Sequence, residues 1–305
     1  EAGVFDYYDK TPSAKLEEKY AELSEKYQLP ILAGGGAYKI GKDEQLLKAN
    51  LQLSARLGSR VHNTQVLWEH EKGHSVTNDE VVSFYLQAAE WGEQCGCLPT
   101  LEVHIRMWSE DFRRVNQVAE EVAKRGATFR MTLDHSHVVF KVDNFDELNK
   151  FNLSEAIASR ELVIDPRLPN NVCQQWIDSD FVWLTHARAA IPNNPKNIWA
   201  THPDGSFGRG IQYPFLQPAE GQYVTEWSEN ELEPWKTVIR LLLKHQLQSR
   251  RTQNRQITTE FIPYPDYGGG HGYSIFENSV ACAKWIRETE KSIRNNDFNQ
   301  DDASA

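Results

Sequence analysis

Hydrophobic and polar positions follow two different periods along the chain. Seven short runs are rich in Val, Ile, Leu and aromatic residues, a composition typical of β-strands. These runs cover residues 3–8, 30–34, 60–66, 99–105, 129–134, 181–187 and 256–262. The segments between them have helical spacing, and strands that alternate with helices are typical of βα units around a parallel sheet.

Five of the intervening segments place apolar residues on one face of a helix and charged residues on the other. They cover residues 13–27, 43–58, 78–95, 109–126 and 229–248. Several begin at Ser, Asn or Asp and two end in Gly, as capped helices do. The pattern predicts an α/β protein with the architecture of a (β/α)8 TIM barrel.

Seven strands are one fewer than this barrel needs, although 305 residues are enough for it. Because the sequence opens almost directly in a strand-like run, we expect the first β/α unit to precede residue 1. Long loops, 138–180 and 189–228, follow strands six and seven of the expected barrel. Loops at these strand ends build the active site of such barrels. We expect one catalytic domain over residues 1–292, followed by a polar, frayed tail over 293–305.

Composition narrows the functional class. The chain is 40% hydrophobic and 25% charged, and no apolar run approaches the roughly 20 residues of a membrane span. A net charge of -10 disfavours a nucleic acid partner, because a phosphate backbone would be repelled. Four cysteines lack the spacing of a disulfide framework or a zinc site, which indicates reduced thiols and a cytoplasmic protein. A small or neutral substrate fits this composition.

Four ionisable residues stand at the ends of successive apolar strands: Glu102, Asp134, His186 and Glu260. In a barrel the carboxyl ends of all strands meet at one rim, so these side chains should converge. Three carboxylates brought together would repel one another and raise their pKa values unless a cation is present. We therefore predict one divalent metal ion held by these four residues. The donor set suits Mn²⁺, which we expect first, or Mg²⁺, Co²⁺ or Zn²⁺.

The order Glu, Asp, His, Glu, together with "LDHSH", "THAR", "GRGIQY" and a late "TEF", resembles the xylose isomerase-like TIM barrel superfamily of sugar phosphate isomerases and epimerases. The resemblance covers nearly the whole chain and implies a metal-dependent sugar isomerase or epimerase. It implies that Glu102, Asp134, His186 and Glu260 are the metal ligands. It further implies that Glu102 and Glu260 move a proton through an enediol-like intermediate, in the way that a positioned carboxylate can.

Other polar residues near the strand ends are candidates for catalysis or substrate binding. By the resemblance, His137, three residues after Asp134, lies beside the metal, and Arg209 contacts substrate. His104 shares a strand face with Glu102 by the two-residue period, so it could act as a base. The remaining candidates for substrate contacts are a strand-end histidine, a tryptophan able to stack on a sugar and a histidine in a glycine-rich loop. These are His62, Trp108 and His271.

Three alternatives share this scaffold. A metal-dependent lyase, similar to 3-dehydroshikimate dehydratases or C-glycoside deglycosidases, would form the same enolate and expel a β-substituent, helped by a histidine such as His104 or His137. Apurinic endonucleases need further histidine ligands, and "ILAGGGAY" at 31–38 lacks them. A non-catalytic sugar-binding subunit is the third. A homo-oligomer is expected from the resemblance, with a partner subunit of another kind as the alternative.

Overall fold

A computed structural model describes residues 2–249, 256–267 and 272–302, with the backbone alone for 296–302. The chain divides into two compact units. The first unit comprises Glu1–Val4, Asp134–Asp180 and His186–Ala305, and the second comprises Phe5–Leu133 and Phe181–Thr185. The chain passes between the units directly after one strand, at Asp134, and within another, at His186. Both positions carry predicted metal ligands.

The second unit is built on a parallel sheet. Its strands pair in the order β1 (Tyr8–Asp9), β2 (Ile31–Tyr38), β3 (Val61–Val66), β4 (Leu98–Glu102), β5 (Met131–Leu133) and β6 (Val182–Ala187). The register places Glu102 opposite Thr132 and Leu133 opposite Thr185. The predicted strands are therefore confirmed, although the first one is short and begins at Tyr8 instead of residue 3.

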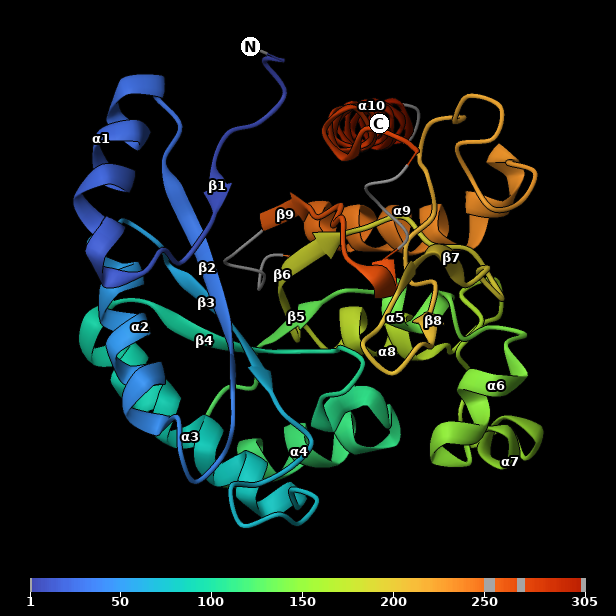
Figure 1. The fold of residues 1–305 in the computed structure, drawn as a ribbon. Coiled ribbons are helices and arrows are strands. Elements are labelled where there is room, and N and C mark those ends of the chain that lie inside the picture. Colours follow the sequence, from blue (N-terminus) through green and yellow to red (C-terminus); the bar gives the residue numbers. More distant parts are fainter. Residues whose placement is uncertain (1, 250–255, 268–271, 303–305) are drawn as a thin grey trace. The chain divides into compact units, whose positions relative to one another are not determined.

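Helices connect these strands as the hydrophobic pattern predicted. They are η1 (Ala14–Leu16), α1 (Glu17–Tyr27), α2 (Glu44–Arg56), α3 (Asn78–Cys95), η2 (Trp108–Glu110) and α4 (Arg113–Lys124). Helix α3 begins with a capping box between Thr77 and Glu80 and ends at Gly96, whose φ of 81° is readily adopted only by glycine. Figure 1 shows α1, α2 and α3 along one side of strands β1–β4. The apolar faces of α2 and α3, with Leu47, Leu51 and Val82 fully buried, form the core there.

The first unit contains most of the long connections. The connection after β5 includes α5 (Ser136–Val139), α6 (Phe145–Leu148), η3 (Asn149–Phe151), α7 (Leu153–Ala158) and α8 (Val172–Asp178). The connection after β6 contains an unexpected antiparallel hairpin of β7 (Asn197–Thr201) and β8 (Phe207–Gly208). The hairpin was not predicted because its strands are short and exposed and follow no apolar run. Both connections are thus ordered structures instead of plain loops.

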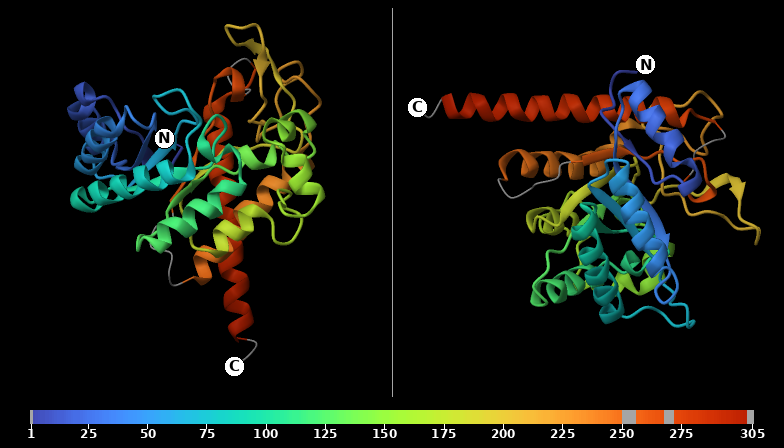
Figure 2. Two further views of the ribbon diagram at one scale, coloured as in Figure 1. Left: turned by 90° about the horizontal axis from the view of Figure 1, so that it is seen from below. Right: turned by 90° about the vertical axis from the view of Figure 1, so that its left-hand side faces the viewer.

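The remaining elements of the first unit are η4 (Glu229–Leu232), α9 (Glu233–Gln248), β9 (Gln256–Thr259), η5 (Pro265–Tyr267) and α10 (Ile275–Asp302). The Glu260 amide, directly after β9, donates to the carbonyl of Ala187 at 3.2 Å, and both residues belong to this unit. Figure 2 shows α10 as a long helix beside α9. It continues through Asp302, into the segment predicted to be a polar tail.

Among the described residues, every helix is too short or too polar to cross a membrane.

Candidate metal and active site

Asp134 follows β5 directly and is fully buried. Its Oδ1 accepts hydrogen bonds from the Ser136 amide at 3.1 Å and the Ser136 hydroxyl at 2.5 Å. These local bonds turn the chain out of the strand and into α5. Its Oδ2 faces Arg188 and lies 3.3 Å from His137 Nε2. A buried carboxylate with this many partners is stabilised as the anion, the form that binds a cation.

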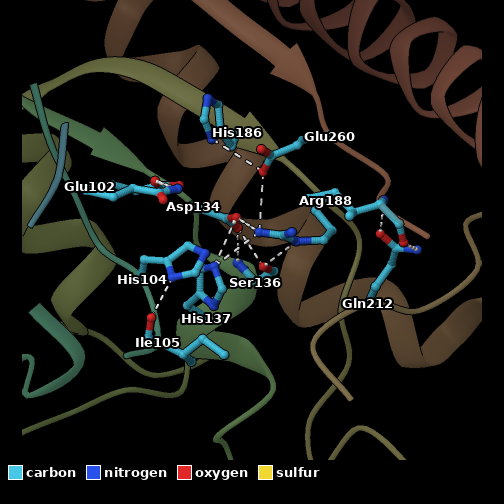
Figure 3. Close-up of polar contacts among 12 residues, drawn as sticks. Glu102, His104, Ile105, Asp134, Ser136, His137, His186, Arg188, Gln212 and Glu260 are labelled. Atoms are coloured by element: carbon cyan, nitrogen blue, oxygen red, sulfur yellow. Dashed lines mark hydrogen bonds and ion pairs between the residues drawn. The ribbon is translucent and has the colours of Figure 1, made fainter. Parts of the chain in front are cut away.

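His186 and Glu260 lie at neighbouring strand ends of the same unit. His186 Nδ1 is 3.3 Å from Glu260 Oε2, and the backbone bond between Glu260 and Ala187 fixes this pairing. Asp134, His186 and Glu260 each offer one ligand atom, and these three atoms lie within 4.8 Å of one another. Figure 3 shows the Glu260 and Asp134 carboxylates directed toward one region of this unit. The predicted convergence is therefore present for these three residues.

Arg188 lies among the candidate ligands, and sequence reasoning missed it. It lies two residues after His186 and is fully buried. Its Nη2 makes ion pairs with both the Asp134 and the Glu260 carboxylates, the latter at 3.3 Å, and donates to His137 Nε2 at 3.1 Å. The "THAR" motif contained a signal for it, because a two-residue period puts Arg188 on the strand face of His186.

In the second unit, Glu102 ends β4 and is almost fully buried. Its carboxylate accepts hydrogen bonds from Asn63 at 2.7 Å and Gln65 at 2.5 Å, both on β3. The first of these distances is typical of a bond to a charged oxygen. His104 donates from Nδ1 to the Ile105 carbonyl at 2.5 Å. Because a carbonyl can only accept, a neutral His104 carries its lone pair on Nε2, as a general base requires.

His62 belongs to the core of the second unit. Its Nε2 lies 2.6 Å from the Tyr38 hydroxyl and its Nδ1 lies 3.1 Å from the Ser54 hydroxyl. Burial lowers the pKa of His62 to about 3, since a charged imidazole would lose its hydration there. His62 therefore packs in the core, and the substrate contact expected of it does not fit the structure. The sequence alone could not reveal this, because a residue of a strand can face either side of the sheet.

Trp108 is also buried, with 1% of its surface exposed. The Arg114 guanidinium lies 5.8 Å from the centre of its ring. A ring enclosed in this way cannot stack on a sugar, so the stacking role expected of Trp108 does not fit the structure. A tryptophan at a strand end is more often a core residue for this reason.

Arg209 forms a two-pronged ion pair with the buried Glu147. The glycines on either side of Arg209 allow close backbone contacts. A Cβ on Gly210, which has a φ of 77°, would lie 2.1 Å from the Pro195 carbonyl oxygen. The substrate contact of Arg209 remains a prediction. His271 lies outside the described residues.

Comparisons with known proteins identify the fold. No family model matches the sequence, and no curated protein is detectably similar to it. The solved structure of an L-ribulose 3-epimerase matches with a TM-score of 0.51 and 11% identity, covering 97% of this chain and 88% of the other. A xylose isomerase-like TIM barrel protein from Mycobacterium smegmatis in complex with magnesium matches with a TM-score of 0.51 and 12% identity, covering 96% and 85%. These matches confirm the predicted TIM-barrel fold.

Proposed function

We propose that this protein is a divalent-metal-dependent isomerase or epimerase of a small sugar. The observation that carries the proposal is the group of Asp134, His186 and Glu260, whose ligand atoms lie within 4.8 Å of one another at the strand ends of one unit. The same fold serves an L-ribulose 3-epimerase, although fold alone never fixes an activity. Glu102 is proposed as the fourth ligand. It ends β4 and pairs with Thr132 of β5, two residues before Asp134.

The donor set fits a divalent cation. Carboxylate oxygens with one imidazole suit Mn²⁺, Mg²⁺, Co²⁺ or Zn²⁺, and the similar Mycobacterium smegmatis protein was solved with magnesium. Mn²⁺ is our first choice. When bound, such an ion polarises a carbonyl or hydroxyl oxygen of the substrate and so acidifies the adjacent C–H group.

The protein residues supply the proton transfer. Glu102 and Glu260 are the proposed acid and base, which exchange a proton with the substrate carbon through an enediol-like intermediate. Asn63 and Gln65 hold the Glu102 carboxylate in one orientation. The Ser136 hydroxyl holds Asp134. His137, whose Nε2 accepts a hydrogen bond from Arg188, and His104 are the proposed further bases or substrate contacts.

The proposed location of the protein is the cytoplasm. All four cysteines, Cys95, Cys97, Cys173 and Cys282, are free thiols, which suits the cytoplasm. Self-association into a homo-oligomer is part of the proposal. Neither a nucleic acid nor a membrane has a role in it.

The test is an activity screen in deuterated water. Purified protein loaded with Mn²⁺ is offered ketoses, aldoses and 3-keto sugars, with and without phosphate groups. Deuterium found on carbon in an otherwise intact sugar would support isomerisation or epimerisation. Release of water or of an aglycone would instead support the lyase alternative, in which His104 protonates a leaving group. Neither deuterium on carbon nor release of water or of an aglycone from any sugar would contradict both.

A further inference from the structure

The guanidinium of Arg188 occupies the position between two of the proposed ligands. A single nitrogen, Nη2, contacts both Asp134 Oδ2 and Glu260 Oε2. Glu260 Oε2 is also the atom that lies 3.3 Å from His186 Nδ1. Figure 3 shows the guanidinium between the two carboxylates. A cation that used these same oxygens would compete directly with Nη2.

Several contacts hold the guanidinium at this position. Nε donates to the Ser136 hydroxyl at 3.2 Å, and Nη2 donates to His137 Nε2 at 3.1 Å. The planar group also lies over the Tyr267 ring, 4.3 Å from its centre. Arginine keeps its charge at every accessible pH. This positive charge can therefore leave the ligands only by moving, and never by losing a proton.

We propose that Arg188 is a built-in competitor of the metal ion and sets the affinity of the site. In this inference, which rests on the proposed function, binding of the ion requires Nη2 to leave Asp134 and Glu260. Because the guanidinium is planar and rigid, Nε and both Nη nitrogens would turn away together, and the bond from Nε to Ser136 would be lost as well. Without the ion, Arg188 neutralises the two carboxylates that would otherwise repel each other while buried. The site is then assembled before metal arrives, at the cost of weaker binding.

The first experiment compares Mn²⁺ affinity in the wild-type protein, Arg188→Met and Arg240→Met, by isothermal titration calorimetry. Methionine resembles arginine in length and flexibility but carries no charge. Arg240 belongs to the same unit but pairs with Glu233 at 2.8 Å, away from the ligands, so it controls for the loss of one positive charge. We expect Arg188→Met to bind Mn²⁺ at least tenfold more tightly than the wild type, and Arg240→Met to bind with unchanged affinity.

The outcomes separate the two proposals. If Arg188→Met binds Mn²⁺ with wild-type affinity or more weakly, the competitor role is wrong and the metal site stands. If neither the wild type nor Arg188→Met binds Mn²⁺, the competitor role and the proposed function both fail.

A second measurement covers the case in which Arg188→Met does not fold. Arginine side chains of the wild-type protein are labelled with ¹⁵N, and their NMR signals are followed during titration with Mg²⁺, which is diamagnetic. Displacement of a buried, hydrogen-bonded guanidinium predicts that one set of slowly exchanging Nη signals shifts or broadens in step with binding. Binding of Mg²⁺ that leaves every arginine signal unchanged would refute the competitor role.

Discussion

The Gln212 side chain pairs with the backbone of Ile262 as a neighbouring strand would. Its Oε1 accepts from the Ile262 amide at 2.7 Å, and its Nε2 donates to the Ile262 carbonyl at 3.2 Å. Gln212 is fully buried. Since Ile262 is two residues beyond Glu260, this pairing helps to fix the position of the Glu260 carboxylate.

We predict that Gln212→Ala lowers kcat/KM or Mn²⁺ affinity by about 10- to 100-fold, the usual effect of losing a residue that orients a ligand. The reason is that the Ile262 amide and carbonyl lose their partner and the chain after β9 is less constrained. Steady-state kinetics and calorimetric titration measure the two quantities. Gln222→Ala, which removes an exposed side chain of the same unit, is the matched control. Equal kcat/KM and equal Mn²⁺ affinity in the two variants would show that Gln212 does not position Glu260.

A second prediction concerns the close backbone approach at Gly210. Alanine there must adopt a φ of 77° and would also place its Cβ 2.1 Å from the Pro195 carbonyl oxygen. The conformational strain alone costs about 1–2 kcal/mol, so the clash should raise the loss in free energy of unfolding beyond this. Gly205 has a similar φ of 82° but open space around it. Gly205→Ala therefore measures the strain alone, and urea unfolding that gives equal losses for the two variants would show that the clash is relieved.

A third prediction concerns pH. Burial lowers the pKa values of both His62 and His135 to about 3 in the folded protein, from an ordinary value of 6.5. Below pH 6.5, the unfolded chain therefore binds protons at these positions while the folded protein does not. The free energy of unfolding should fall as the pH drops, by up to about 1.4 kcal/mol per pH unit for each histidine.

Urea unfolding between pH 7 and about 5 tests this, because carboxylates remain largely ionised in that range. His62→Gln should reduce the slope of stability against pH by the contribution of one histidine, up to about 1.4 kcal/mol per pH unit. A variant with the wild-type slope would show that His62 does not carry the effect.

The sequence predicted the features that follow from strand periodicity. Asp134, His186 and Glu260 were found because each interrupts an apolar run at a strand end, and parallel strands bring such ends together. The same reasoning failed for His62 and Trp108. Whether a residue near a strand end faces a site or the core depends on side chains from distant elements, such as Tyr38 and Ser54 around His62.

Residues that act through long-range contacts were not predictable. Gln212 pairs with Ile262, 50 residues later in the chain, and a lone glutamine in a connecting segment carries no signal of this. Arg188 was visible within "THAR", but an arginine in a strand usually faces solvent. Its burial becomes apparent only once the Asp134 and Glu260 carboxylates are known to flank it. The hairpin of β7 and β8 was not predicted because its short, mostly exposed strands follow no apolar run.

The most direct test of the central claim is the metal content of the wild-type protein and of Glu260→Gln. Both proteins are loaded with Mn²⁺, dialysed against metal-free buffer and analysed by inductively coupled plasma mass spectrometry, with circular dichroism to verify the fold. The account predicts one ion per wild-type chain and loss of the ion from folded Glu260→Gln, because an amide oxygen replaces a charged ligand. A wild-type protein without bound metal, or a folded Glu260→Gln variant with full occupancy, would contradict it.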